Sequence, residues 1–320
     1  MSPNKRPLPR RCVHTAESAK DFIDYLLPSG NHWGHANRGD LAYRGQASSS
    51  WGLVPKAFRK GERIGFGASA PKSDTTSVTL QARAEFQAVH QFVKAADDAG
   101  LQVASGGARI LLDEPKRIFD DRNWEYDWPQ QVMWEVLALA QHHGVPTRLL
   151  DLTDDPLVAA FFASSFAFHS LKLRKRTRGY LAVWVIDLRF IRAINQIDSR
   201  YQERIAEIRV PRANNSYLHA QFAFFLIDRG VNDTMARGEL SSIDSVVIDR
   251  ARFWHSGSRL KGKRIKPTWF HKFPIMKVRL HVAHSAELLH ELENRGVTKA
   301  CIMPSLDRVV ESLELQRSTR

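Results

Sequence analysis

Hydrophobic positions recur along this sequence with two different periods. Over residues 79–99, Phe86, Val89 and Val93 are spaced to share one face of a helix, and Gly100 follows as a stop signal. Residues 179–188 instead alternate and are rich in β-branched side chains, which is typical of a strand. The pattern therefore predicts both helices and strands within the same chain.

The remaining hydrophobic segments extend this prediction. One helix is expected to begin after Thr15 as its cap, a second near Pro129, and a third after Pro304. Two more are expected over residues 157–168 and 285–294. Strands are expected over residues 41–45, 217–227, 243–248, 278–282 and 299–303. Because helices and strands fall in blocks, and no Pro-, Gly- or Ser-rich linker follows Ser77, we expect one α+β domain.

The stretch QHHGVPTRLLDLTDDPLVAAFFA, residues 141–163, concentrates polar side chains between two apolar helices. Gly144 is the expected end of the first helix, and Asp155, before Pro156, is the expected cap of the second. Polar groups at such a crossing need partners. Two interpretations stay open: the stretch lines a pocket, or Arg148 and Asp151 form an internal ion pair that fixes the turn.

Candidate chemistry in this stretch is limited. The sequence has no P-loop, GxSxG, HExxH or suitably placed GxGxxG motif. His142 and His143 are adjacent and point about 100° apart on a helix, so we expect no metal from them but rather a pocket donor or base, or a helix cap. Asp151, Asp154 and Asp155 are the one acidic cluster that suits Mg²⁺ in a nuclease, and the alternative is that they form a helix cap and a turn.

Charge and cysteine content bear on partners and compartment. The chain of 320 residues has 47 Lys and Arg against 34 Asp and Glu, a net charge of +13, which favours a polyanionic partner such as nucleic acid. A generic basic surface, or an acidic protein partner, is the alternative. Cys12 and Cys301 lie far apart, no apolar stretch follows the basic start, and no apolar run spans a bilayer. We therefore expect a cytoplasmic protein that contacts no membrane, with residues 1–14 disordered.

Residues 250–280 form the most basic segment, with aromatic residues interleaved and no acidic residue. Basic groups neutralise phosphates and exposed aromatics stack on bases, so the segment is typical of single-stranded nucleic-acid binding. The alternative is a solvated basic hairpin whose aromatic residues are core. The candidate nucleic-acid-binding residues are Arg252, Trp254, Arg259, Lys261, Lys263, Arg264, Lys266 and Trp269.

Three motifs together resemble the FRG domain family: Tyr43-Arg44-Gly45-Gln46, the stretch at residues 141–163, and Met303-Pro304-Ser305-Leu306-Asp307. The resemblance spans about residues 16–313, so residues 15–320 are expected to form one FRG domain.

The strand ending in Tyr43-Arg44-Gly45, followed by a Thr-containing strand and an Ala- and Phe-rich helix, is also similar to ADP-ribosyltransferases. This resemblance implies a split mixed or antiparallel sheet flanked by helices, with NAD as substrate and no metal. Gln221 stands where those transferases have glutamate, and an amide orients a ribose hydroxyl but does not stabilise positive charge as a carboxylate does. Either Asp151 or Glu135 supplies the carboxylate instead, or the site binds NAD without turnover.

The resemblance assigns roles to the site residues. The expected catalytic residues are Arg44, Gln221 and Asp151. The expected NAD-contacting residues are Tyr43, Arg44, Gly45, His142, His143, Thr147, Arg148 and Thr153. Arg44, Thr147, Arg148, Asp151 and Gln221 are expected to converge on one cleft.

The function implied is that of an NAD-dependent ADP-ribosyltransferase-like toxin or antiviral-defence effector. Its expected substrate is RNA or single-stranded DNA, with RNA favoured, and its expected regulator is an inhibitory partner protein, an antitoxin. The alternatives are a non-catalytic nucleotide-binding or protein-interaction module and, third, a nuclease.

Overall fold

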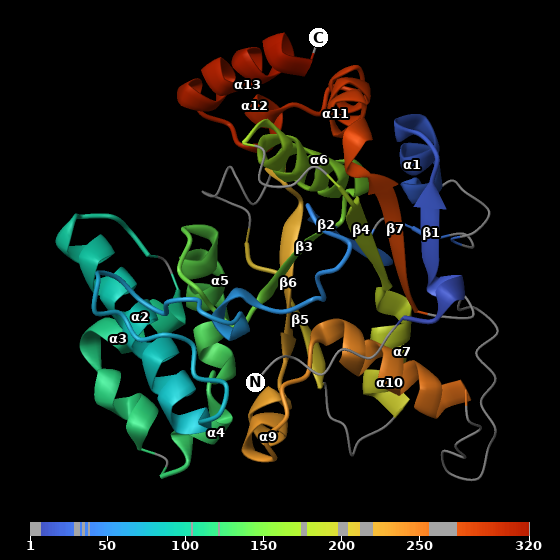
Figure 1. Cartoon of the computed structure of the whole chain (residues 1–320). Coiled ribbons are helices and arrows are strands. Elements are labelled where there is room, and N and C mark those ends of the chain that lie inside the picture. Colours follow the sequence, from blue (N-terminus) through green and yellow to red (C-terminus); the bar gives the residue numbers. More distant parts are fainter. Residues whose placement is uncertain are drawn as a thin grey trace.

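The computed structural model describes residues 8–28, 33, 36–37, 39–103, 105–120, 122–173, 178–197, 204–211, 220–255 and 274–319. Its centre is a seven-stranded sheet with strand order β1-β7-β4-β2-β3-β6-β5 (Figure 1). The strands are β1 (Val13–Ala16), β2 (Leu41–Gln46), β3 (Leu150–Thr153), β4 (Tyr180–Asp187), β5 (Ile205–Ile208), β6 (Ala223–Asp228) and β7 (Ile275–His281). The pair β1–β7 is parallel and the other pairs are antiparallel, so the expected α+β class with a mixed sheet is confirmed.

Helices surround the sheet. They are α1 (Ala19–Leu26), α2 (Val78–Asp98), α3 (Gly106–Asp113), α4 (Trp124–Asp127), α5 (Trp134–His142), α6 (Pro156–Lys172), α7 (Leu188–Ile197), α9 (Val231–Ala236), α10 (Ile243–His255), α11 (Ser285–Glu293), α12 (Lys299–Ile302) and α13 (Leu306–Thr319). Short 3-10 turns occur at Arg10–Cys12, η3 (Lys56–Phe58), Pro115–Phe119, Gln131–Met133 and Val282–His284.

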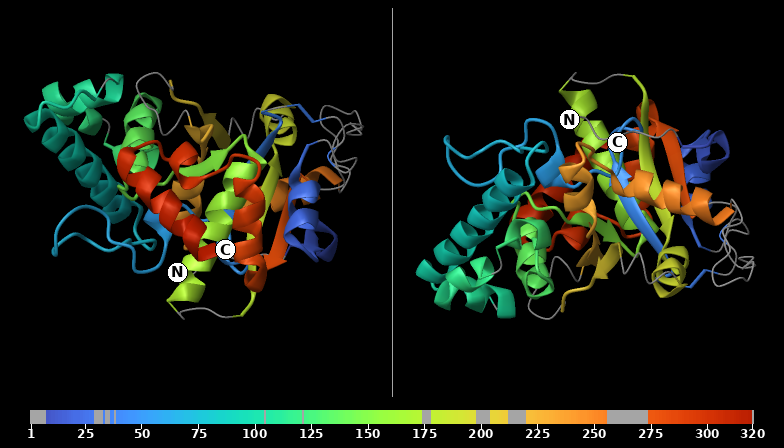
Figure 2. Two further views of the ribbon diagram at one scale, coloured as in Figure 1. Left: turned by 90° about the horizontal axis from the view of Figure 1, so that it is seen from above. Right: turned by 90° about the horizontal axis from the view of Figure 1, so that it is seen from below.

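Alternation of side chains along the strands gives the sheet two faces. Tyr43, Thr153 and Ala223 lie opposite one another on β2, β3 and β6, and they therefore share one face. Helices α1, α6 and α11 cover this face over β1, β7, β4 and β2, whereas α2 to α5 cover it over β3, β6 and β5. Helices α7 and α10 cover the opposite face (Figures 1 and 2). Two separate helix groups thus share one face of the sheet.

The sheet is narrowest between those two helix groups. Strands β2 and β3 share a single register pair, Tyr43 opposite Thr153, whereas β2 and β4 pair along all of β2 from Leu41 to Gln46. The sheet therefore consists of two portions, β1-β7-β4-β2 and β3-β6-β5, joined by a short contact.

Helix α6 lies directly against β2 at Gly45. A Cβ atom built on Gly45 would stand 1.9 Å from the carbonyl oxygen of Ala159 and 2.8 Å from the backbone nitrogen of Ala163. Only glycine permits this approach. The glycine of the Tyr43-Arg44-Gly45 motif therefore sets the distance between the sheet and α6.

Strand β1 is an edge strand whose neighbour in the described sheet is β7. The register pairs Val13 with Lys277 and Thr15 with Arg279, and Arg279 Nε donates a hydrogen bond to Thr15 Oγ1 at 2.8 Å. This edge of the sheet is thus formed by β1 and β7, the first and the last of the described strands in the sequence.

Several predicted elements need correction. Residues 243–248 begin α10 instead of a strand, and buried Ile243, Val247 and Ala251 have helical spacing there. The strand expected over residues 299–303 is instead helix α12 (Lys299–Ile302), which Thr298 caps by accepting a hydrogen bond from Cys301 N at 3.3 Å.

Two further boundaries were wrong. Thr15 belongs to β1, and Ser18 caps α1 by accepting from Asp21 N at 3.1 Å. The strand expected over residues 217–227 begins at Ala223, so Gln221 precedes it, and residues 217–219 lie outside the described residues. At the N-terminus, residues 1–7 also lie outside the description, while Arg10–Cys12 form a 3-10 turn.

Candidate functional site

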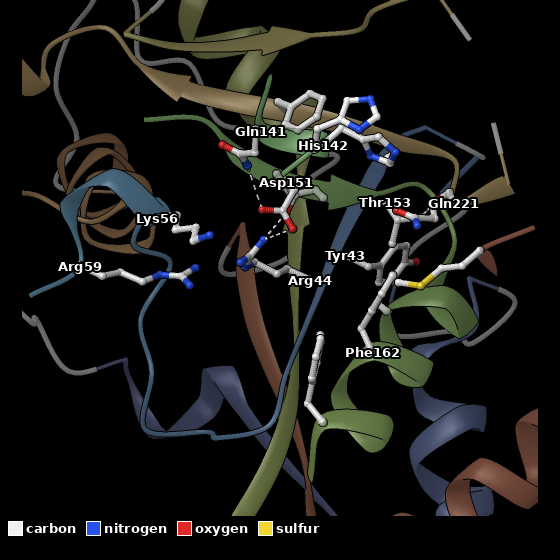
Figure 3. Close-up of a pocket in the computed structure, with 18 of the residues that line it drawn as sticks. Tyr43, Arg44, Lys56, Arg59, Gln141, His142, Asp151, Thr153, Phe162 and Gln221 are labelled. Carbon is white, nitrogen blue, oxygen red and sulfur yellow. Dashed lines mark hydrogen bonds and ion pairs between the residues drawn. The ribbon is translucent and has the colours of Figure 1, made fainter. Parts of the chain in front are cut away.

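A cavity of about 690 Å³ lies over the β2–β3 junction, between the two helix groups (Figure 3). Its walls are β2, β3 and the start of β6, the end of α5, one side of α6, the turn η3 and the C-terminal segment around Met303 and Arg308. Of the expected site residues, those that line it are Tyr43, Arg44, Gly45, His142, His143, Asp151, Thr153 and Gln221. The cavity thus brings together the catalytic candidates and most of the NAD-contacting candidates.

Arg44 crosses the junction and binds Asp151 twice. Its Nη1 donates to the main-chain carbonyl oxygen of Asp151 at 2.5 Å and lies 2.7 Å from carboxylate Oδ2. The surrounding protein acts to raise the pKa of Asp151, but the charge and hydrogen bond of Arg44 outweigh it, so the pKa is below its ordinary value. Asp151 is therefore ionised at neutral pH, and 59% of its side chain stays accessible from the cavity.

A chain of hydrogen bonds holds Asp151 from the other side. Gln141 Nε2 donates to Asp151 Oδ1 at 3.1 Å, and Gln141 Oε1 accepts from the buried hydroxyl of Thr147. Thr147 Oγ1 also accepts from Leu149 N at 3.2 Å. Thr147 therefore lies behind the cavity wall and fixes Gln141, which in turn fixes the carboxylate.

The opposite end of the cavity contains Tyr43, Thr153 and Gln221. The Thr153 hydroxyl donates to the Gln221 carbonyl oxygen at 2.6 Å and accepts from Asp155 N at 3.0 Å. The Gln221 side chain donates to the Ile302 carbonyl oxygen at 3.3 Å, which ties this wall to α12.

The Tyr43 hydroxyl is buried and has no hydrogen-bond partner among the described residues. Burial, aided by the negative charge of Asp155, raises the pKa of Tyr43. The phenol is therefore neutral and keeps a proton to donate. A buried polar group without a partner is rare in folded proteins, and here it lies in a cavity wall.

His142 and His143 both line the cavity, with ring centroids 5.3 Å apart and planes nearly perpendicular at 81°. Burial, followed by the neighbouring His143, lowers the pKa of His142 to about 4. His142 is thus a neutral imidazole at physiological pH. Across the described ranges, no three metal-ligating side chains gather at one point.

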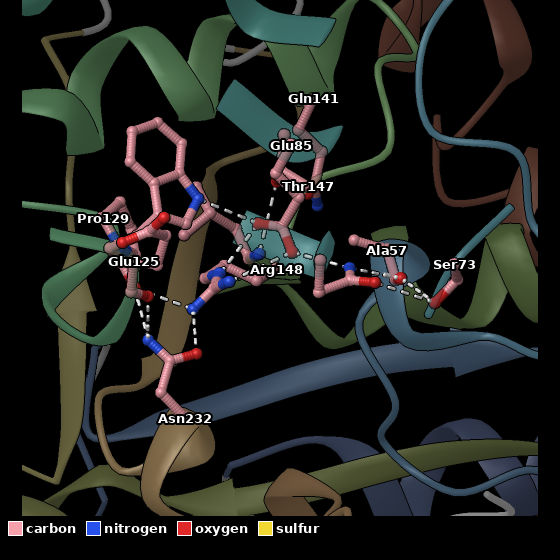
Figure 4. A network of polar contacts seen from close by, with 12 residues as sticks. Ala57, Ser73, Glu85, Glu125, Pro129, Gln141, Thr147, Arg148 and Asn232 are labelled. Atoms are coloured by element: carbon pink, nitrogen blue, oxygen red, sulfur yellow. Dashed lines mark hydrogen bonds and ion pairs between the residues drawn. The ribbon is translucent and has the colours of Figure 1, made fainter. Parts of the chain in front are cut away.

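Arg148 does not line the cavity. It is buried with Glu85 of α2 at Nε–Oε2 2.7 Å, and its Nη1 donates to the Trp128 carbonyl oxygen at 2.7 Å and to Asn232 Oδ1 at 2.9 Å (Figure 4). Asn232 in turn donates to carbonyl oxygens of residues 125, 126 and 128. These bonds join α2, α9 and the segment before α5 into one buried network.

The expectation that Thr147 and Arg148 converge on the cleft is therefore wrong. The alternative, an internal pair of Arg148 with Asp151, is wrong as well, because Arg148 binds Glu85 and Asp151 binds Arg44. Glu85, the buried acid that pairs with Arg148, lies 63 positions earlier in the sequence. No local pattern around residues 141–163 indicates it.

The other acids of the central stretch have structural partners. Asp155 caps α6, as expected, by accepting from Leu157 N at 2.8 Å. Asp154 accepts two hydrogen bonds from Arg209, at 2.8 and 2.9 Å. Neither carboxylate lines the cavity beside Asp151. Glu135 is absent from the described lining as well.

Sequence reasoning missed Lys56 and Arg59, which follow the YRGQ motif and line the cavity from η3. Lys56 Nζ donates to the Gly144 carbonyl oxygen at 3.0 Å, and Arg59 Nε donates to the Val54 carbonyl oxygen at 3.2 Å. It also missed Phe162 of α6. The only local signal is a pair of basic residues three positions apart after the motif.

Most of the candidate nucleic-acid-binding residues lie outside the described residues: Arg259, Lys261, Lys263, Arg264, Lys266 and Trp269. Arg252 is exposed on α10, and nothing is described of the Trp254 side chain. Helix α10 covers the sheet face opposite to the cavity. Among the described helices, none has the length and apolar character needed to cross a bilayer.

Comparison with known proteins returns one family. No curated protein and no solved structure matches this chain. Residues 108–170 match the family model of the FRG domain, a segment that runs from α3 through α5 and β3 into α6 and includes Gln141, His142 and Asp151 of the cavity. The expected resemblance to the FRG domain family is thereby supported over residues 108–170 of this chain.

Proposed function

We propose that the cavity binds NAD and that the protein transfers ADP-ribose from it to a nucleic acid, with RNA favoured. The observation that carries the proposal is the meeting of Arg44, Asp151 and Gln221 in one cavity, although they come from three strands or strand ends. A volume of about 690 Å³ is in the range of sites for nucleotide-sized ligands.

The two ends of the cavity suit different parts of a dinucleotide. Arg44 gives one end positive charge, which phosphate groups require. The other end offers the Tyr43 hydroxyl and the Phe162 ring, to which a planar base and a ribose are complementary. An ADP-ribosyltransferase-like arrangement of the sheet is part of the same proposal.

The chemistry proposed is a substitution at the ribose C1′ atom. The glycosidic bond to the nicotinamide nitrogen breaks, its electron pair leaves with nicotinamide, and an acceptor oxygen or nitrogen bonds to C1′ and releases its proton. Positive charge develops on the ribose during this step, and a preorganised carboxylate stabilises it. Asp151 is ionised, is held by Gln141 and Arg44, and is the one acid in the described lining.

A non-catalytic nucleotide-binding module is the second candidate. One observation favours it: Arg44 offsets the charge of Asp151, and Gln221 supplies an amide where a carboxylate is needed. Both candidates bind NAD, and only turnover separates them. In either case the net charge of +13 favours a nucleic-acid or acidic protein partner, including an inhibitor that covers residues 250–280.

The test is incubation of the purified protein with NAD labelled in the adenylate moiety and separate RNA, DNA and protein pools. We expect label on RNA, loss of it in Arg44→Ala, and poor rescue by Arg44→Lys, since an ammonium does not replace the planar guanidinium. Arg109→Ala is the matched control, because Arg109 is 86% exposed on α3 and does not line the cavity. Absence of both NAD binding and label transfer in the unmodified protein would sink the proposal.

A further inference from the structure

The cationic end of the cavity contains two positive side chains that the proposed transfer chemistry does not use. Lys56 and Arg59 extend from η3 and direct their charged ends toward the same space as Arg44 (Figure 3). Arg44 is engaged by Asp151. The terminal guanidinium nitrogens of Arg59 make no hydrogen bond to the described residues.

These two side chains are fixed in place by the main chain around them. Lys56 Nζ donates to the carbonyl oxygen of Gly144, where α5 ends, and keeps its other N–H groups for a ligand. Arg59 Nε donates to the Val54 carbonyl oxygen, which leaves its outer nitrogens directed away from that contact. A preorganised cation needs little ordering on binding.

The turn η3 is itself anchored. Ala57 N donates to the Thr147 carbonyl oxygen at 3.1 Å, and the Ala57 carbonyl oxygen accepts from Gln81 Nε2 at 2.9 Å and from Ser73 Oγ at 2.6 Å. Three separate segments therefore hold the turn that presents Lys56 and Arg59.

Positive charge exceeds negative charge at this end. Asp151 is the one acid in the described lining, and Glu62 Oε1 lies 3.8 Å from Lys56 Nζ. Loss of solvent within the cavity wall, followed by the positive charge of Arg44, lowers the pKa of Arg59, while Asp151 and Glu62 oppose this shift. The cations therefore repel one another, and a bound anion relieves that repulsion.

We infer that Lys56 and Arg59, together with Arg44, form a subsite for the pyrophosphate of the bound nucleotide. This inference rests on the proposed function for the identity of the nucleotide, but the anion site itself does not depend on it. A pyrophosphate carries charge on two adjacent groups and matches cations presented from both η3 and β2. Its place at this end puts the nucleoside portion toward Tyr43 and Phe162.

The test is calorimetric titration with inorganic pyrophosphate, inorganic phosphate, ADP-ribose and NAD. In the unmodified protein we expect pyrophosphate to bind more tightly than phosphate and to compete with NAD. Lys56→Gln and Arg59→Gln are each expected to weaken ADP-ribose and NAD binding by about tenfold or more, as loss of a charge-assisted hydrogen bond does. Lys60→Gln is the matched control, because Lys60 is the exposed neighbour of Arg59 and does not line the cavity.

The outcomes separate the two proposals. Unchanged NAD affinity in both single variants overturns the subsite and leaves NAD binding intact. Pyrophosphate binding that the variants lose, with no NAD binding in any form of the protein, supports the subsite and overturns the proposed substrate. Competition in the unmodified protein needs no variant, so absence of competition between pyrophosphate and NAD counts against the subsite even if a variant misfolds.

Discussion

Arg44 on β2 contacts both the main-chain carbonyl oxygen and the carboxylate of Asp151 on β3. Main-chain pairing between these strands is limited to Tyr43 opposite Thr153, so a side chain continues the junction where the ladder stops. The same residue also faces the cavity. A ligand anion that binds Arg44 therefore lies at the contact between the two portions of the sheet.

The buried pair of Arg148 and Glu85 is expected to matter for stability. Arg148→Met leaves Glu85 without its cation in a fully buried position, and removal of one partner of such a pair costs ~3–5 kcal/mol in the free energy of unfolding. The control Lys94→Ala, in a pair whose side chains are both 63% exposed, should cost less than about 1 kcal/mol. Urea denaturation measures both. A loss of NAD binding without a loss of stability in Arg148→Met would show that Arg148 contacts the ligand and would contradict its structural role.

Gln221→Glu tests whether the cavity lacks a carboxylate. If C1′ substitution is the reaction, an added negative charge beside the ribose should raise NAD turnover by roughly tenfold or more. Gln221→Met, which removes the bond to the Ile302 carbonyl oxygen without adding charge, is the control for altered packing. Release of nicotinamide measures the rate. NAD binding with no gain in turnover in Gln221→Glu would favour the non-catalytic module.

His142 is expected to contribute a pH dependence to stability. Its pKa is lowered from 6.5 to about 4 in the folded protein, so the unfolded chain takes up a proton over that range that the folded chain does not. The free energy of unfolding should therefore fall as the pH decreases from 6.5 toward about 4. His142→Gln should make this decrease shallower, as measured by denaturation at several pH values. Equal slopes in the two proteins would contradict the neutral imidazole.

Gly45→Ala tests the close contact of α6 with β2. The added Cβ would lie 1.9 Å from the Ala159 carbonyl oxygen, so the helix must move, and we expect a loss of several kcal/mol or failure to fold. Gly106→Ala is the control, since its Cβ would meet only Val132 Cγ2 at 3.7 Å, an ordinary contact. Thermal denaturation compares the two variants. Equal melting temperatures would show that α6 does not depend on this glycine.

The basic segment is tested by the salt dependence of RNA binding. Replacement of Lys261, Lys263 and Arg264 by Gln should flatten the plot of log affinity against log salt by about three contacts, at roughly 0.7 each for a single strand. Trp269→Ala should weaken binding by ~1–3 kcal/mol with little change of slope. The matched control replaces exposed cations elsewhere, Lys94, Arg109 and Arg117, which are 63%, 86% and 66% exposed. A flat salt response in the unmodified protein would exclude nucleic acid as the acceptor of ADP-ribose and leave a protein as the acceptor.

The local sequence was sufficient to predict an element where the residues that determine it are near one another in the chain. The helical period of α2, the strand β4 and the Asp155 cap of α6 were all predicted, because spacing and cap chemistry depend on a few neighbouring residues. The same locality misled at residues 243–248 and 299–303, where β-branched and apolar residues suggested strands. Burial against β7 and a Thr298 cap make them helices.

The residues of the candidate site were likewise predicted in part. Arg44, Asp151 and Gln221 were predicted to meet and do line one cavity. Arg148 looked equally suited, but its partner Glu85 lies on a helix that the local motif does not include. Lys56 and Arg59 went unnoticed because only the folded chain places η3 beside the end of α5.

The pairing of β1 with β7 has a consequence for the order in which a ribosome produces this molecule. Thr15 emerges early, yet its register partner Arg279 is made only after every other strand of the sheet. Met303 and Arg308, which complete the cavity wall, emerge later still. A nascent chain therefore holds its YRGQ motif in an unfinished sheet until β7 has been synthesised. The cavity wall is therefore complete only after Arg308 has been synthesised, long after the YRGQ motif that also lines it.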